Sequence, residues 1–198
     1  MRQARAFLEN SLMKDTTSYI YSIGHGSRKI EDFIQLLNIY EVKYVVDVRS
    51  KPRSRFHPQY NQKKLQELLK ESGIGYLFLG NQLGGLPSES ACYDEEGHVA
   101  YKKVETMDFY KEGLERLVAA NEKKIKIACM CSEIDPCDCH RSKLIGVSLE
   151  SQEIHMLHIN RSGAIETQSN VIKNVINASS GKDLFSDDVS LKSRNSYR

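Results

Sequence analysis

Short apolar segments alternate along this chain with amphipathic segments of helical spacing, and this alternation constrains the fold more than any other feature. The run Tyr44-Val45-Val46 is continuously apolar, as in strands that are covered on both faces. Strands are predicted at residues 19–23, 43–48, 76–79, 124–128 and 154–159. The pattern predicts an α/β three-layer sandwich, with a mainly parallel sheet of about five strands and helices on both faces.

The length of 198 residues fits one domain of ordinary size with extensions at both ends. We expect a leader at residues 1–18, either disordered or forming one short helix. A single α/β domain is predicted at 19–160. Residues 161–198 are more polar and are predicted to be a tail that could form one short helix.

Composition narrows the classes of protein to consider. The net charge of +2 is too small to imply non-specific binding to nucleic acid or to a membrane surface. No apolar run approaches the roughly 20 residues of a membrane helix, and the N-terminal residues lack the apolar core of a secretory signal. The cysteines are odd in number, and four of the five are clustered, without a spaced disulfide framework. We therefore expect a cytoplasmic protein that uses thiols for metal binding or chemistry.

Polar residues follow four of the predicted strands. They are Gly24-His25, Asp47 with Arg49, the Gly-rich segment at 80–85, and the cysteine loop at 129–142. Parallel strands point their carboxyl ends the same way, so these groups are expected to meet at one edge of the sheet, where α/β proteins bind ligands.

The cysteine loop contains two Cys-x-Cys pairs, followed by His140 and Arg141. Structural zinc sites usually contain Cys-x₂₋₄-Cys pairs, so this spacing is not a standard zinc pattern. We expect Cys129 and Cys131 to point to opposite faces of their strand and therefore not to bind one ion together. The candidate metal ligands are Cys131, Cys139 and His140, and the ion would be zinc or iron.

Cys131 is also a candidate nucleophile. A helix amino terminus and a nearby arginine lower the pKa of a thiol and favour the thiolate. Glu133 would raise the pKa of a thiol beside it. This carboxylate is either paired with an arginine or a general base, and the sequence leaves both open.

The segment from Asp47 to His57 contains Arg49, Lys51, Arg53 and Arg55 at alternate positions. A solvated charged loop is the usual explanation of such a run, but Arg49 directly follows a buried strand and Pro52 stiffens the loop. Guanidinium groups suit phosphate, sulfate and carboxylate. Asp47 is expected to hold Arg49 or His25 in place, and His25 is a candidate acid/base. The residues expected to bind substrate are Gly24, Arg49, Arg53, Arg141, Gly84 and Gly85.

Asp47-x-Arg49 beside a cysteine loop that ends in Arg141-Ser142 is similar in layout to rhodanese-type sulfur transferases. Four joint motifs carry a more specific resemblance: Tyr-Ser-Ile-Gly-His-Gly-Ser, Val-Val-Asp-Val-Arg-Ser-Lys-Pro-Arg-Ser, the Leu-Gly-Gly loop and Cys-Ser-Glu-x₅-Cys-His-Arg-Ser. Together they resemble the domain of unknown function 488 family over roughly residues 19–159. The resemblance implies a small α/β domain with a site at these positions, and it supplies no reaction.

Two classes of function fit these residues, besides a purely metal-binding protein. The first is a small enzyme acting on an anionic substrate that contains phosphate, a nucleotide or sulfur. It would be a thiol-dependent transferase or hydrolase, or a metal-dependent enzyme. The second is a non-catalytic module for nucleic acid or nucleotides, in which the loop at residues 49–60 contacts phosphates and an aromatic residue stacks on bases. His25, Glu133 and the paired cysteines favour the enzyme.

Overall fold

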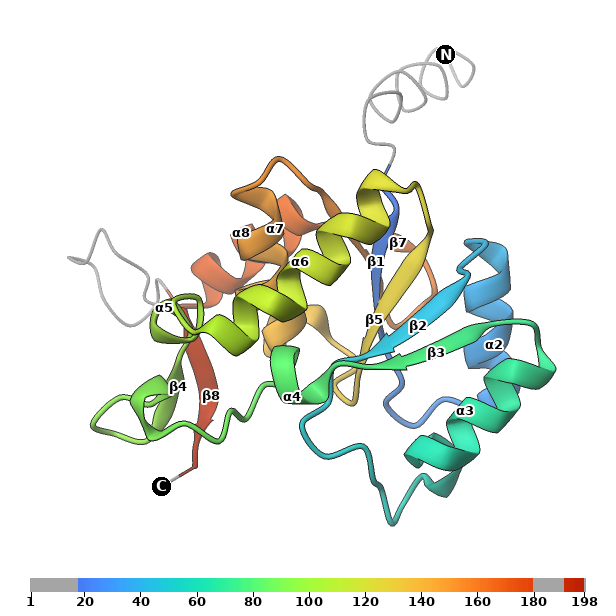
Figure 1. The fold of residues 1–198 in the computed structure, drawn as a ribbon, viewed down its shortest axis with the longest axis horizontal. Coiled ribbons are helices and arrows are strands. Elements are labelled where there is room, and N and C mark those ends of the chain that lie inside the picture. Colours follow the sequence, from blue (N-terminus) through green and yellow to red (C-terminus); the bar gives the residue numbers. More distant parts are fainter. Residues whose placement is uncertain (1–17, 180–190, 198) are drawn as a thin grey trace.

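The computed structural model describes residues 18–179 and 191–197, and its central feature is a six-stranded sheet (Figure 1). The strand order is β3-β2-β5-β1-β6-β7, and only the edge strand β7 runs antiparallel to its neighbour. The strands are β1 (Ile20–Gly24), β2 (Tyr44–Asp47), β3 (Gly75–Phe78), β5 (Ile127–Cys131), β6 (Met156–Ile159) and β7 (Ile165–Thr167). The predicted α/β fold is confirmed, while the prediction of about five strands omitted β7.

Helices cover both faces of the sheet. One face packs on α2 (Ile30–Ile39) and α3 (Gln62–Glu71), through residues such as Phe33 and Leu65. The other face packs on α6 (Asp108–Glu122) and on the helical segment formed by the π-helix η4 (Arg141–Gly146) and α7 (Val147–Glu150). Figure 1 shows α2 and α3 lying together, apart from α6 and α7. The three layers follow from the burial of one apolar stripe on each helix.

The two faces divide the residues of β5. Ala128 and Met130 pack with α2 and α3, whereas Cys129 and Cys131 both belong to the core on the α6 side. The prediction that these two cysteines point to opposite faces is therefore wrong. Side chains alternate with a period of two along a strand, so residues two apart share a face.

The register places the carboxyl ends of the central strands level with one another. Gly24 in β1 lies beside Cys131 in β5, and Asp47 in β2 lies beside Met130. Backbone hydrogen bonds continue past the strand ends, from His25 N–H to Cys131 O and from Val48 N–H to Met130 O. The loops that follow β1, β2 and β5 therefore start from neighbouring points.

The predicted loop at residues 80–101 contains short elements: α4 (Gly80–Leu83), the 3₁₀ turn η2 (Ser90–Cys92) and β4 (His98–Ala100), followed by α5 (Tyr101–Val104). Two further 3₁₀ turns, η1 (Pro58–Tyr60) and η3 (Pro136–Asp138), lie in other loops. Strand β4 pairs antiparallel with β8 (Lys192–Ser196), which returns the chain's last described residues to the body of the domain. Helix α8 (Gln168–Ser179) follows β7.

The leader predicted at residues 1–18 lies outside the described residues except for Ser18. Within the described part of the chain, no helix combines the length and apolarity that crossing a membrane requires.

Candidate metal centre

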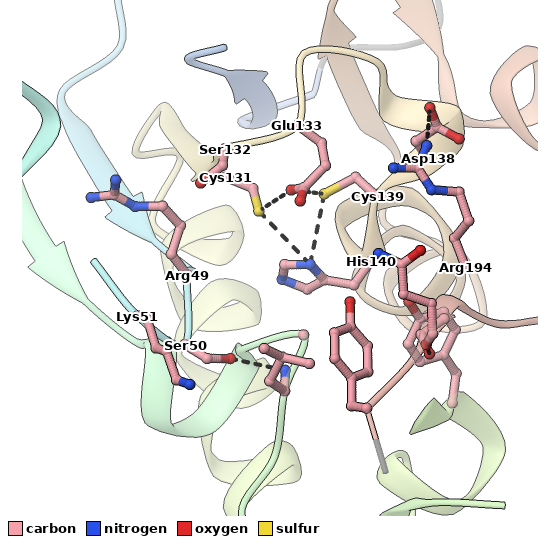
Figure 2. Close-up of a pocket in the computed structure, with 16 residues that line it drawn as sticks. Arg49, Ser50, Lys51, Cys131, Ser132, Glu133, Asp138, Cys139, His140 and Arg194 are labelled. Carbon is pink, nitrogen blue, oxygen red and sulfur yellow. Dashed lines mark hydrogen bonds and ion pairs between the residues drawn. The ribbon is translucent and has the colours of Figure 1, made fainter. Parts of the chain in front are cut away.

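Two thiols and one imidazole converge at the carboxyl end of β5. Cys131 is the last residue of that strand, and Cys139 and His140 stand just before η4 after the loop has folded back. Figure 2 shows both sulfurs directed at the imidazole. His140 Nδ1 lies 3.9 Å from Cys131 Sγ and 3.6 Å from Cys139 Sγ, and all three ligand atoms lie within 4.8 Å of one another.

The orientation of His140 exposes Nδ1 to the sulfurs. Its other nitrogen, Nε2, lies 3.1 Å from the carbonyl oxygen of Val48 and donates a hydrogen bond to it. A neutral imidazole held this way has its free lone pair on Nδ1, which is how metal-binding histidines are commonly fixed. A Cβ atom at Gly85 would lie 2.8 Å from Nδ1. Glycine therefore keeps the space in front of this nitrogen open.

These separations fit a tetrahedral metal ion. With Zn–S near 2.3 Å and Zn–N near 2.0–2.1 Å, a sulfur and a nitrogen ligand lie about 3.6 Å apart. The two sulfur-to-Nδ1 distances of 3.9 and 3.6 Å are close to this value. Thiolate and imidazole ligands suit zinc and iron better than magnesium or calcium. The three residues could therefore hold zinc or iron with little rearrangement.

Arg141 is fully buried behind the cluster, and its guanidinium lies against Cys139. Nε donates to Cys139 Sγ at 3.2 Å, while Nη1 donates to Ser22 Oγ and Nη2 to the carbonyl oxygen of Glu133. Burial raises the pKa of Cys139, but the hydrogen bond from Cys131 and the charge of Arg141 outweigh it and hold that pKa well below its usual range. The same hydrogen bond to Cys139, together with burial, raises the pKa of Cys131. The negative charge therefore resides on Cys139.

Glu133 lies at the open side of the two sulfurs. Its Oε2 is 2.7 Å from Cys131 Sγ and 3.5 Å from Cys139 Sγ, and the residue as a whole is exposed. The carboxylate forms no ion pair with Arg141, which instead contacts the Glu133 backbone. A side chain in this position can exchange protons with solvent and with a molecule beside the sulfurs.

Arg49, Asp47 and His25 form a second cluster next to the first. Both carboxylate oxygens of Asp47 accept hydrogen bonds from Arg49, at 2.9 Å from Nε and 2.6 Å from Nη2. Nη2 also donates to Tyr60 O, and Nη1 lies 3.3 Å from His25 Nε2. Figure 2 shows the Arg49 guanidinium pointing away from the sulfurs. Most of its donors are thus engaged within the protein.

His25 is held by both of its ring nitrogens. Nδ1 lies 2.9 Å from Gly26 O, and the ring stacks on Tyr60 with centroids 4.1 Å apart. Burial lowers the pKa of His25 to about 4. The His25 side chain does not line the pocket beside the sulfurs. It therefore lies apart from the Cys131 thiol, although the His25 backbone N–H donates to the Cys131 carbonyl oxygen.

Two of the glycines predicted to bind substrate allow close backbone packing, and the predicted Arg53 lies away from the pocket. A Cβ atom at Gly24 would lie 1.9 Å from the Glu133 carbonyl oxygen, and one at Gly84 would lie 2.2 Å from Gly80 O. Both glycines therefore allow segments to pack closely. Arg53 is exposed and lies outside the pocket.

A pocket of about 180 Å³ opens in front of the cluster. Lys51 and Tyr101 line this pocket. The last described segment also lines it, with Ser193, Arg194, Asn195 and Tyr197. Arg194 Nη1 lies 3.0 Å from Asp138 Oδ2 and so connects β8 to the cysteine loop. No motif in the sequence marks these C-terminal residues, because only the pairing of β8 with β4 brings them here.

A buried polar chain behind Arg141 was also missed. Ser22 Oγ lies 2.6 Å from His158 Nδ1, His158 Nε2 lies 2.6 Å from Gln168 Oε1, and Gln168 Nε2 donates to Ser142 O at 2.8 Å. The available signal was a histidine in an otherwise apolar strand, but its partners are distant in sequence.

Residues 29–147 match the family model described as Domain of unknown function DUF488. The chain belongs to the DUF488 family. Comparison with curated proteins and with solved structures finds no match. The DUF488 match includes Cys131, Glu133, Cys139 and His140, while β1, β6, α8 and β8 lie outside it. The candidate ligands thus belong to the DUF488 region, and part of the pocket wall does not.

Proposed function

We propose that this DUF488 protein is an enzyme built around one zinc ion bound by Cys131 Sγ, Cys139 Sγ and His140 Nδ1. The observation that carries the proposal is the convergence of these three atoms at separations close to those of a tetrahedral site. The hydrogen bond from His140 to Val48 O and the buried Arg141 beside Cys139 support the same function.

The arrangement favours a catalytic site over a structural one. Structural zinc sites are closed by four protein ligands, whereas catalytic sites have three and an open position. Here three ligands stand beside a pocket that is open to solvent. A zinc ion with three protein ligands supplies Lewis acidity and lowers the pKa of water to near neutrality. Glu133, on the pocket wall beside both sulfurs, would accept and return protons.

The pocket wall suits a small substrate with an anionic group. Lys51 lines it and supplies positive charge, whereas Arg194 is paired with Asp138, and Tyr101 and Tyr197 add aromatic surface. Arg49 lines the same pocket but is bound to Asp47, and Arg141 is committed to Cys139 and backbone. We therefore assign anion binding to Lys51, and a supporting role to Arg194, which pairs with Asp138, and to the two buried arginines.

Elemental analysis of untagged protein tests the proposal. We expect about one zinc per chain in the native protein and in Cys137→Ser, a control from the same loop whose sulfur lies outside the cluster. Cys131→Ser and Cys139→Ser should each lose most of the metal, and Glu133→Gln should retain it. Absence of metal after incubation with micromolar zinc would refute the proposal, as would equal loss in the Cys137 variant.

One observation favours a second candidate, a metal-free thiol enzyme. Arg141 Nε lies 3.2 Å from Cys139 Sγ, as expected for a guanidinium that stabilises a thiolate. This contact points to Cys139 as nucleophile, where the sequence had suggested Cys131. Iodoacetamide labelling of chelator-treated protein, mapped by mass spectrometry, tests it. Labelling of Cys139 no faster than an ordinary free thiol at pH 7 would exclude this candidate.

A further inference from the structure

Positive charge is concentrated in the segment that follows β2. Residues 48–66 contain six lysines and arginines and no aspartate or glutamate, although the whole chain has 28 basic and 26 acidic residues. Arg49 is neutralised by Asp47, and Lys64 lies near Glu67. The cations left without a carboxylate partner among the described residues include Lys51, Arg53 and Arg55, and all three are exposed.

This loop is held in a defined shape. The backbone N–H of Ser54 donates to Asn61 Oδ1 at 2.7 Å, and the N–H of His57 donates to Ser54 Oγ at 3.0 Å. The N–H of Gln62 donates to Pro52 O at 3.0 Å, which closes the loop onto the start of α3. In Figure 1 the cyan segment between β2 and α3 projects beyond the sheet. The exposed cations therefore stand on a preorganised projection.

The projection also carries the most exposed large apolar side chain among the described residues. Phe56 is 86% exposed and lies directly after Arg55. An aromatic ring this exposed contributes little to the core. Bases stack on such rings without regard to their identity, while neighbouring lysines and arginines contact the phosphates.

We propose that the loop at residues 51–57 binds single-stranded nucleic acid. Lys51, Arg53 and Arg55 contact phosphates, and Phe56 stacks on a base. A single strand fits better than a duplex, because the loop presents neither a helix nor a β-ribbon to a groove and a duplex hides its base faces. Lys51 also lines the pocket, so the bound strand lies beside the candidate metal centre.

Fluorescence anisotropy with a labelled 15-nucleotide oligo-dT tests the proposal on the full chain. We expect binding at low salt and a log–log slope of roughly −2, since about three phosphate contacts contribute about 0.7 each for single strands. Phe56→Ala should weaken binding roughly 5- to 150-fold. Arg53→Ala/Arg55→Ala should weaken it and reduce the slope by about 1.4.

A matched control removes two exposed cations at the opposite end of the sheet, Lys43→Ala/Lys123→Ala. It should bind like the native chain. The proposal is overturned if oligo-dT does not bind at low salt, if the control weakens binding as much as the arginine pair does, or if a labelled poly-glutamate peptide binds equally well. Cys139→Ser should still bind oligo-dT, so failure of the metal proposal and failure of this one are distinguishable.

Discussion

His158 gives a prediction whose sign and size follow from its contacts. The side chain is fully buried in β6. Gln168 donates to Ser142 O through Nε2, so its Oε1 must accept from His158 Nε2. Nδ1 then accepts from the Ser22 hydroxyl. A second ring proton, at Nδ1, would point at the Ser22 hydroxyl proton and would place a cation near Arg141. Burial lowers the pKa of His158 to about 4.

The consequence is a loss of stability in acid. The unfolded chain binds a proton at this histidine near its ordinary pKa of 6.5, whereas the folded chain does so only near 4. Between these values the unfolded state holds more protons, so the free energy of unfolding falls as the pH falls. Relative to pH 7, the contribution of His158 to this loss is about 2 kcal/mol at pH 5 and about 3 kcal/mol at pH 4.

The assay is urea unfolding of the native chain and His158→Gln at pH 7, 6, 5 and 4.5, in the presence of a chelator. The variant keeps a donor and an acceptor but cannot titrate. It should be less stable at pH 7, and the difference should shrink by about 2 kcal/mol by pH 5. His25, whose pKa is also lowered to about 4, contributes equally to both proteins. A difference that stays constant with pH would refute the reasoning.

Three other substitutions test the surroundings of the site. Gly85→Ala should weaken zinc affinity by about tenfold or more, measured by competition with a chromophoric chelator, because its methyl group crowds the metal-facing imidazole nitrogen. Asp47→Asn should lower the free energy of unfolding in urea by about 3–5 kcal/mol, because Arg49 remains charged and buried, and adding Arg49→Met should recover part of the loss. Gly146→Ala should cost roughly 1–3 kcal/mol in the same assay, since its Cβ would lie 2.3 Å from Gln168 Oε1.

The sheet could be predicted from the sequence because its signals are local. Continuous apolar runs mark strands such as β2, and Gly73, with a φ of 74°, ends α3 in the left-handed conformation that favours glycine. The convergence of loops at one edge then follows from parallel strands. The candidate metal ligands could also be predicted from the sequence, because Cys131, Cys139 and His140 lie within ten residues of one another.

What the sequence did not reveal depends on contacts between distant segments. Strand β7 is three residues long and β8 is strongly polar, so neither has an apolar pattern. The chain from Ser22 through His158 to Gln168 joins three elements. The division of roles between the two cysteines also depends on Arg141, because only the fold decides which sulfur its Nε contacts.

Arg141 links the fold to the chemistry through its charge. It is fully buried, and no described carboxylate forms an ion pair with it. Burying a guanidinium without a negative partner would cost several kcal/mol, and its side-chain contacts offer one group that ionises to an anion, the Cys139 thiol. The folded state therefore favours a thiolate at Cys139 without any metal ion. In the proposed zinc site, the two thiolates would balance the charge of the ion. A buried guanidinium and a buried thiolate, each costly to bury alone, thus offset one another at Arg141 and Cys139.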